Sequence, residues 1–334
     1  MCFNGKSVVV TGGTGSFGQA FIKRMLSRYE PRRLTIFSRD EWKQHEMSRA
    51  FSRSEHPCLR YRLGDVRNRY RLVEVLRNTD IVVHAAAQKQ VPACEHNPFE
   101  AVSTNVMGSQ NVVQAAVECG VKKVVLLSTD KAVDPINLYG ATKMTAEKLV
   151  VSGNIMSGQK TLCSVVRYGN VFGSRGSVIP LWLEQAKGGV ITATDLNATR
   201  FWISLDRAVS LVEEALRCML GGEVFIPRIR AATMDELRDV VAPECSINKI
   251  GMRPGEKMHE TLVSRQEDGF IKMLSDEVLV ILPRKYWYTE EMRSKWVGTD
   301  LPLGTSYESN MPKLHMKAPE LSSMFELYRA EHCI

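Results

Sequence analysis

A tyrosine and a lysine lie four residues apart, at Tyr139 and Lys143, and the run Ser128-Thr129-Asp130-Lys131 precedes them. If Tyr139 to Ser152 form a helix, one turn separates the phenol from the ammonium group, and both lie on the same face. A positive charge nearby lowers the pKa of a phenol, so that Tyr139 can act as a base near neutral pH. The pair is common by chance, but beside a strand-end hydroxyl it predicts a proton-transfer site.

A glycine-rich turn follows the first apolar segment, Ser7 to Thr11. Glycines at this spacing let the backbone approach a pyrophosphate, and the N-terminus of the following helix offers free N–H groups. The sequence therefore predicts a dinucleotide site near the N-terminus. The residues expected to contact the cofactor there are Gly12, Thr14, Gly15, Ser16, Phe17 and Gly18.

The end of the second predicted strand indicates which dinucleotide is bound. An NAD-selective protein presents an acidic residue to the ribose at this point, whereas this sequence has Ser38 and Arg39, with Lys43 close behind. Cationic side chains suit a 2′-phosphate, so the pattern favours NADP. Asp40 keeps NAD open as the alternative.

Further cofactor contacts are expected where later strands end. Asp65 and Val66 suit an adenine edge, and the small side chains of Ala85, Ala86 and Ala87 let the backbone pass beside the dinucleotide. His84 is interpreted as a packed histidine rather than a catalyst. Asn105 is either a satisfied polar group or a brace near the site; because asparagine is unfavourable inside a helix, the brace is preferred.

Strand-length apolar runs alternate with amphipathic segments through the first half of the chain. This alternation predicts an α/β fold with a Rossmann-like, doubly wound parallel sheet, and a ligand crevice at the carboxyl ends of its strands. Residues 1–170 are expected to bind the cofactor, with 204–226 returning to the sheet. Residues 171–203 and 227–334 are expected to form a smaller, discontinuous α/β substrate-binding lobe and a C-terminal tail.

Composition narrows the classes of partner. Lysine and arginine number 44 against 37 acidic residues, and the excess is scattered as on a solvated surface, so nucleic acid is not expected. The eight cysteines have no metal-binding spacing, so we expect no metal. No signal peptide and no apolar run of about 18 residues is present, so we expect no membrane partner and a cytoplasmic location.

Together these motifs resemble the extended short-chain dehydrogenase/reductase superfamily, and more narrowly its inverting UDP-N-acetylglucosamine 4,6-dehydratases. The resemblance covers about the first 265 residues. Beyond the motifs above, it includes four further segments: Lys89 to Pro92, Arg167 to Asn170, Ser174 to Pro180 and Thr199 to Trp202. It also includes Arg253-Pro254-Gly255-Glu256-Lys257.

The resemblance implies a mechanism in which a tightly bound NADP oxidises the sugar at C4, water leaves across C5 and C6, and the hydride returns to C6. Tyr139 would take the C4 hydroxyl proton, Lys143 would hold the ribose, and Thr129 would bond the C4 oxygen. Lys131 replaces the glutamate that removes the C5 proton in the related retaining enzymes. It would therefore have to be uncharged, with Asp130 protonated to assist the leaving hydroxyl.

The resemblance also implies a substrate and an assembly. UDP-N-acetylglucosamine would give UDP-2-acetamido-2,6-dideoxy-β-L-arabino-hexos-4-ulose, a precursor of pseudaminic acid or related surface sugars, and the protein would be a homo-oligomer, a dimer or a hexamer. The residues expected to contact the nucleotide sugar are Lys89, Asn170, Ser177, Val178, Thr199, Arg200, Arg253 and Glu256.

Two other functions remain open at this point. A nucleotide-sugar 4-epimerase would share the glycine turn and the Tyr139–Lys143 pair but needs no acid and base at C5 and C6. A non-catalytic NADP-binding protein of the same fold would show no turnover despite bound cofactor. Asp130 and Lys131 could also form an ordinary strand-end salt bridge.

Overall fold

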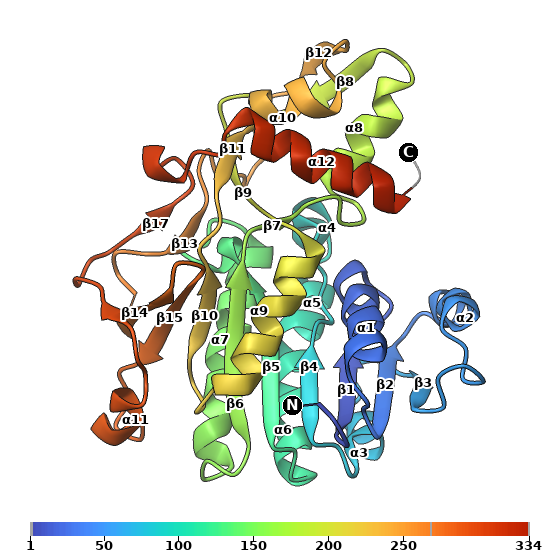
Figure 1. Ribbon diagram of the computed structural model, residues 1–334, viewed down its shortest axis with the longest axis vertical. Coiled ribbons are helices and arrows are strands. Elements are labelled where there is room, and N and C mark those ends of the chain that lie inside the picture. The colour runs from blue at the N-terminus through green and yellow to red at the C-terminus, as the bar shows by residue number, and fades with distance from the viewer. Residues whose placement is uncertain (1–2, 268, 333–334) are drawn as a thin grey trace.

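A parallel sheet forms the centre of the computed structural model, which describes residues 3–267 and 269–332 (Figure 1). The predicted cofactor-binding region and C-terminal tail extend over residues 1–2 and 333–334, which lie outside that part, as does residue 268. Seven parallel strands follow the order β3-β2-β1-β4-β5-β6-β10. Their bounds are β1 Ser7–Thr11, β2 Arg33–Ser38, β3 Leu59–Leu63, β4 Ile81–His84, β5 Lys123–Thr129, β6 Leu162–Tyr168 and β10 Val224–Pro227. The predicted doubly wound sheet is confirmed.

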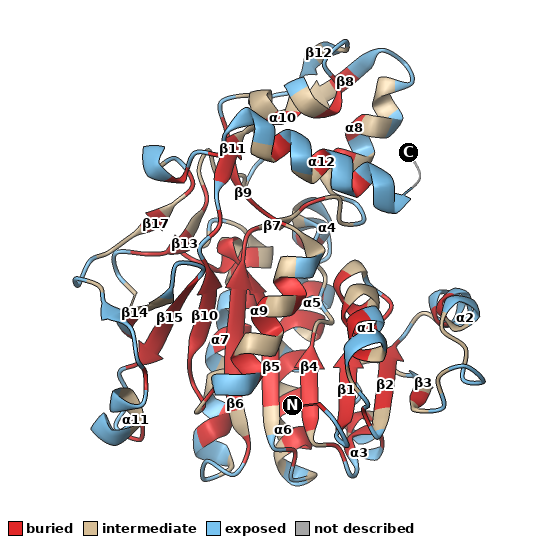
Figure 2. Ribbon diagram, viewed as in Figure 1, coloured by how far each residue is buried: buried red, intermediate tan, exposed pale blue. Residues whose placement is uncertain are grey.

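Helices cover both faces of this sheet. On one face α1 (Ser16–Arg28) packs against α9 (Leu205–Cys218), and on the other α6 (Gly108–Glu118) packs against α3 (Arg69–Leu76) and α7 (Leu138–Met156). The short α2 (Glu41–Ala50) lies at the β2–β3 edge. Because both faces are covered, the strands are apolar on both sides. Figure 2 shows this as a continuous buried centre.

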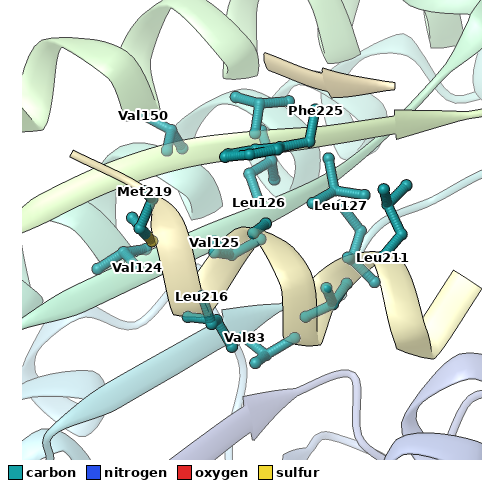
Figure 3. Packing of buried hydrophobic residues seen from close by; sticks show 14 of the residues in the cluster. Val83, Val124, Val125, Leu126, Leu127, Val150, Leu211, Leu216, Met219 and Phe225 are labelled. Carbon is teal, nitrogen blue, oxygen red and sulfur yellow. The ribbon is translucent and has the colours of Figure 1, made fainter. Parts of the chain in front are cut away.

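The packing between α9 and the sheet illustrates the core. Leu211 and Leu216 of α9 lie in the same buried cluster as Val83 of β4 and Val125 of β5 (Figure 3). All four side chains are buried. Burial of one such aliphatic side chain contributes about 1.5–3 kcal/mol, so this layer holds the strand ends, and the loops that follow them, in fixed positions.

The amphipathic segment from Pro98 to Cys119 does not form one continuous helix. It consists of α5 (Pro98–Ala101), a π-helical turn (Val102–Met107) and α6, and a further helix, α4 (Val91–His96), precedes it. A π-turn inserts an extra residue into the helical ladder and redirects the side chains around it. Asn105 lies in this turn.

A smaller lobe lies above the carboxyl ends of the strands (Figure 1). Its sheets are β7-β9-β11 and β8-β12, and α8, α10 and α12 pack around a second buried cluster that contains Trp182 and Trp202. The bounds are β7 Asn170–Val171, α8 Val178–Ala186, β8 Val190–Ala193, β9 Thr199–Ile203, β11 Ala231–Thr233, α10 Met234–Val241, β12 Ser246–Lys249 and α12 Ala318–His332.

Part of the chain expected in the substrate lobe or tail lies elsewhere. Strands β14 (Gly269–Ser275), β15 (Val278–Pro283) and β16 (Thr299–Asp300) extend the large sheet, where β15 pairs antiparallel with β10. The assignment of these residues to the lobe was therefore wrong: β15 is buried along its whole length and covers the edge of β10. Between β15 and β16 lies α11 (Glu290–Ser294), and β13 (Thr261–Val263) pairs with β17 (Tyr307–Glu308).

None of the helices in the described part of the chain is long and apolar enough to span a bilayer.

Candidate active site

A cavity of about 800 Å³ lies between the carboxyl ends of the parallel strands and the smaller lobe. Within the described part of the chain, its walls include every site residue predicted from the sequence except Asn105, Asp130 and Thr199. Residues almost 250 positions apart, from Gly12 to Glu260, meet around this one space. The position agrees with the crevice that an open parallel sheet forms where its strand order reverses.

The glycine turn between β1 and α1 forms one wall. Gly12 has a φ of +66°, and a Cβ at this position would lie 2.8 Å from the backbone nitrogen of Ala86. Only glycine fits both the dihedral angle and the approach of the neighbouring strand end. Gly15 is the N-cap residue of α1, so the helix presents its first amides without a capping side chain. A pyrophosphate fits this cradle, because helix N-termini favour anions.

The loop after β2 presents cations at the same wall. Arg39 and Lys43 both line the cavity, and Arg39 Nη1 lies 4.0 Å from Asp65 Oδ2. Asp40 is already engaged: one oxygen caps α2 at the Lys43 amide, 2.9 Å away, and the other lies 2.8 Å from Lys43 Nζ. Ser38 lines the cavity and accepts a hydrogen bond from Gln44.

Asp65 lies just after β3, and two neighbouring arginines keep its carboxyl group ionised. Burial would raise the pKa of its carboxyl group, but the hydrogen bonds from Arg67 and the charge of Arg39 outweigh burial and lower it. Arg67 Nη2 lies 2.7 Å from Asp65 Oδ2. An ionised acceptor therefore lines the cavity just after β3.

Two polar residues predicted near the site lie behind its wall. His84 is buried; its Nδ1 is 2.6 Å from Thr11 Oγ1 and its Nε2 is 3.1 Å from Ser109 Oγ. Asn105 bonds the Gln88 backbone twice, accepting from N at 2.8 Å and donating to O at 2.9 Å. It therefore braces the loop after β4, in the way the sequence interpretation preferred, and its side chain does not line the cavity.

Helix α7 brings Tyr139 and Lys143 to the cavity. Asn137 caps the helix by accepting a hydrogen bond from Gly140 N at 2.8 Å, and both Tyr139 and Lys143 line the cavity. Lys143 Nζ donates to the Leu127 carbonyl oxygen at 2.7 Å. Burial lowers the pKa of Lys143 to about 8, and the charge of Glu147 opposes this shift.

The electrostatic partner of Tyr139 differs from the one predicted. Burial raises the pKa of Tyr139 to about 12, and the positive charge that opposes this shift is that of Lys131, not of Lys143; a hydrogen bond with Thr129 acts in the same direction. Lys143 is not among the larger causes of this shift, and its ammonium group donates to the Leu127 carbonyl oxygen. A cationic ligand group beside Tyr139 would lower the pKa further.

The Lys131 ammonium group lies between the carboxyl groups of Asp130 and Glu260. Its Nζ is 3.1 Å from Asp130 Oδ1, 3.1 Å from Glu260 Oε1 and 3.3 Å from Asn170 Oδ1. Burial lowers the pKa of Lys131, but the two carboxyl groups outweigh burial and raise it above its ordinary value. The sequence interpretation required an uncharged Lys131, and these surroundings instead stabilise its charged form.

Asp130 has the opposite tendency. Burial is the main cause that raises the pKa of its carboxyl group. The charge of Lys131 opposes this shift, and the charge of Glu260 adds to it. This is the direction that a proton-donating Asp130 requires. Its Oδ2 is buried and has no hydrogen-bond partner among the described residues, and the side chain lies beneath Lys131 rather than in the cavity wall.

The wall formed by the smaller lobe carries polar groups at its rim. Arg200 is buried, donates to the Met258 carbonyl and lies 3.2 Å from Glu256 Oε1. Ser177 is the N-cap residue of α8, and its Oγ is buried without a partner among the described residues. Lys89, Asn170, Val178 and Arg253 line the same space.

Thr199 was expected to contact substrate, and this prediction was wrong. Its Oγ1 lies 2.9 Å from His259 Nδ1 and 2.6 Å from Ser309 Oγ, away from the cavity. Thr199 opens β9 and forms a bridge with His259, the residue before Glu260. Sequence reasoning missed Glu260 itself; the only signal was its place three residues after the Arg253–Lys257 segment.

Known proteins share this architecture. A family model described as "Polysaccharide biosynthesis protein" matches residues 8–280. A Campylobacter jejuni protein named UDP-N-acetylglucosamine 4,6-dehydratase (inverting) is 48% identical over 268 residues, 79% of each chain. A Rickettsia conorii protein named UDP-glucose 4-epimerase is 44% identical over 274 residues, 79% of this chain and 80% of its own.

The fold agrees over a greater length with a solved structure. The structure titled Pen from Bacillus thuringiensis has a TM-score of 0.88 and 36% identity, and the match covers 98% of each chain. The similarity thus extends through the strands after residue 265, where the sequence motifs give only a loose resemblance. The resemblance indicated by the motifs is confirmed, and the chain belongs to the polysaccharide biosynthesis protein family, alongside inverting UDP-N-acetylglucosamine 4,6-dehydratases.

Proposed function

We propose that the protein is an inverting UDP-N-acetylglucosamine 4,6-dehydratase that uses NADP. One observation carries the proposal: Tyr139 and Lys143 face the same cavity as Lys131, whose neighbour Asp130 has an elevated pKa. A site that only oxidises and reduces C4 needs the first pair alone. The second pair supplies the acid and base that loss of water requires.

The glycine cradle, the first turn of α1 and the small side chains of Ala85 to Ala87 fit a dinucleotide, for which Lys143 would hold a ribose and Asp65 would face the adenine edge. The choice of NADP rests on Arg39 and Lys43, which can bond a 2′-phosphate. Asp40, the residue that kept NAD open, already accepts from the Lys43 amide and ammonium groups. Hydride transfer from C4, and its return to C6, is the chemistry that the bound dinucleotide would supply.

The protein residues move the protons. Tyr139 removes the proton of the C4 hydroxyl, and Thr129 bonds the resulting carbonyl oxygen, which makes the C5 proton acidic. Lys131 removes the C5 proton, and water leaves as Asp130 gives its proton to the C6 hydroxyl. For this step the Asp130 carboxyl group, which lies behind Lys131 in the free protein, would have to turn into the cavity. A proton then returns to C5 on the opposite face, which inverts that centre. The substrate thus loses two protons, to Tyr139 and Lys131, and receives two, one on the leaving hydroxyl from Asp130 and one at C5.

The nucleotide diphosphate is assigned to the wall formed by the smaller lobe. The first turn of α8, with the buried Ser177 hydroxyl, favours an anion, and Arg200 and Arg253 add charge. Lys89 also lines this region; burial and the charge of Arg175 lower its pKa. Asn170 and Val178 would contact the sugar, and Glu256 would hold Arg200 in place.

The remaining parts of the proposal concern the cellular setting. The product would enter the synthesis of pseudaminic acid or a related surface sugar, in the cytoplasm, and the active protein would be a homo-oligomer. The name of the Campylobacter jejuni relative supports the substrate, whereas the setting and the assembly follow from the family resemblance alone.

The experiment that tests this proposal is turnover of UDP-N-acetylglucosamine in deuterium oxide without added reductant. We expect a product lighter by one water, with a methyl group at C6 and deuterium at C5. Recovery of the C4 epimer with its C6 hydroxyl intact would instead make the protein an epimerase, like the named Rickettsia relative. Unchanged substrate with bound cofactor would indicate a non-catalytic protein.

A further inference from the structure

We propose that Glu260 takes the proton from Lys131 Nζ and so generates the amine that removes the C5 proton, and that Ser309 of the C-terminal segment holds Glu260 in place for this transfer. The inference rests on the proposed dehydratase function and adds a residue to its machinery. Glu260 acts through Lys131 and is therefore a positioning and proton-holding residue rather than one that contacts the reacting carbon.

The geometry leaves Glu260 as the available acceptor. Lys131 Nζ is 3.1 Å from an oxygen of Asp130 and 3.1 Å from Glu260 Oε1. The Asp130 oxygen also accepts from Thr129 Oγ1 at 2.9 Å, and Asp130 must keep its own proton for the leaving hydroxyl. Glu260 is 2% exposed, forms part of the cavity wall, and its Oε2 has no partner among the described residues.

The surrounding charges decide where the proton rests before substrate binds. Four groups face the pair: Asp130 from the turn after β5, Arg200 from β9, Lys257 from the loop before β13 and Tyr139 from α7. Burial raises the pKa of Glu260, but Lys131 and Arg200 outweigh burial and lower it, while the two carboxyl groups raise that of Lys131. In the free protein the proton is therefore on Lys131, where it blocks the base.

Substrate changes this balance. A sugar that fills the cavity displaces water, and loss of solvation favours a neutral amine and carboxylic acid over an ion pair. The transfer breaks one N–H bond and forms one O–H bond, and it needs no further reactant. The amine then takes the C5 proton.

The C-terminal segment fixes Glu260 from both sides. Ser309 Oγ accepts from the Glu260 amide at 2.8 Å, and the Ser309 amide donates to the Glu260 carbonyl oxygen at 2.9 Å. The same hydroxyl group lies 2.6 Å from Thr199 Oγ1, and Ser309 is buried. Ser309, to which the sequence analysis assigned no role, thus connects Thr199 with the backbone of Glu260.

The test compares Glu260→Gln with the wild-type protein. In the variant, the step at C4 should remain visible as absorbance of the reduced cofactor near 340 nm, whereas deuterium uptake at C5 should fall about 100-fold or more. The pH profile distinguishes a role of Glu260 in proton transfer from a purely structural role. Lys131 of the variant can become neutral only by releasing its proton to solvent, so uptake should rise about tenfold per pH unit between pH 6.5 and 8.5, while that of the wild type stays nearly flat.

A loss of the same factor at every pH would show a structural role and overturn the proposal, as would unchanged uptake. Glu260→Asp keeps a carboxylate and should keep the flat profile, although the rate falls; a steep profile for this variant would also contradict the proposal. Glu256→Gln is the matched control, because Glu256 faces the same cavity but pairs with Arg200. It should alter KM without changing the pH slope at saturating substrate.

Ser309→Ala tests the clamp. We expect C5 exchange to fall about tenfold with a flat pH profile, and Ser322→Ala, at an exposed serine of α12, should match the wild type. Wild-type exchange in Ser309→Ala would remove the C-terminal segment from the proposal. If the wild-type protein itself yields neither product nor C5 label, the proposed function fails; if it turns over and Glu260→Gln does so equally, only this inference fails.

Discussion

The backbone of Lys131 occupies the space that a side chain at position 140 would need. A Cβ atom added at Gly140 would overlap the Lys131 carbonyl oxygen and approach Pro135 Cβ to 3.0 Å. Gly140 therefore lets the start of α7 lie directly on the turn after β5. This contact sets the position of Tyr139, the neighbour of Gly140, relative to Thr129 and Lys131.

Gly140→Ala should move Tyr139 of α7 away from Thr129 at the end of β5 and Lys131 in the turn that follows. We expect kcat to fall about 100-fold or more, because a displacement of about 1 Å between catalytic groups has an effect of that size. The free energy of unfolding should fall by about 1–3 kcal/mol from overpacking. Steady-state kinetics and urea unfolding measure the two effects.

Gly188→Ala is the matched control, because a Cβ there meets only the Gln185 carbonyl oxygen, at 3.5 Å. It should leave both kcat and stability close to those of the wild type. A Gly140→Ala variant with normal turnover would mean that the turn after β5 can move without loss of function.

The Rossmann half of the fold could be predicted from local patterns. The strand-length apolar runs of the first half of the chain agree with strands β1 to β6, because period and length identify buried parallel strands. The glycine turn and the Tyr139–Lys143 pair were found for the same reason: their meaning lies in short spacings along the chain.

What depends on distant contacts could not be predicted. Glu260 precedes β13, which pairs with β17, and Ser309 bonds its backbone; nothing around Glu260 in sequence indicates these contacts. The charge state of Lys131 follows from its contact with Glu260. Likewise, the sequence of β14 and β15 suggested part of the substrate-binding lobe, although β15 pairs with the edge of β10 and β14 pairs with β15.

Arg39→Ala should weaken binding of NADP while changing that of NAD little. Arg39 lines the cavity at the end of β2, and a hydrogen bond to a charged group contributes about 1.5–3 kcal/mol, or roughly 10- to 100-fold in Kd. Titration of cofactor-free protein with each dinucleotide measures the ratio of the two affinities.

The control for that variant is Arg49→Ala, at an arginine of α2 that is exposed and pairs with Glu46 at 3.7 Å. It removes the same charge from the same helix region without touching the cavity. Equal losses of NADP affinity in the two variants would reduce the role of Arg39 to general surface charge.

His84 should make the protein sensitive to acid. Burial, with a smaller effect of the Lys143 charge, lowers the pKa of His84 to about 3. The unfolded chain, in which the pKa is about 6.5, therefore binds a proton first as pH falls. The contribution of His84 to stability is complete above pH 6.5 and declines at lower pH until about pH 3.

His84→Asn measures this contribution. The free energy of unfolding of the wild type should decrease by about 2 kcal/mol more than that of the variant between pH 7 and pH 5, as measured by urea unfolding at half-unit steps. The variant will be less stable at pH 7, since it loses contacts with Thr11 and Ser109, so the informative quantity is the difference in slope. Parallel curves would mean that His84 binds a proton in the folded protein near its ordinary pKa, and that the wall behind the alanine strand end admits water.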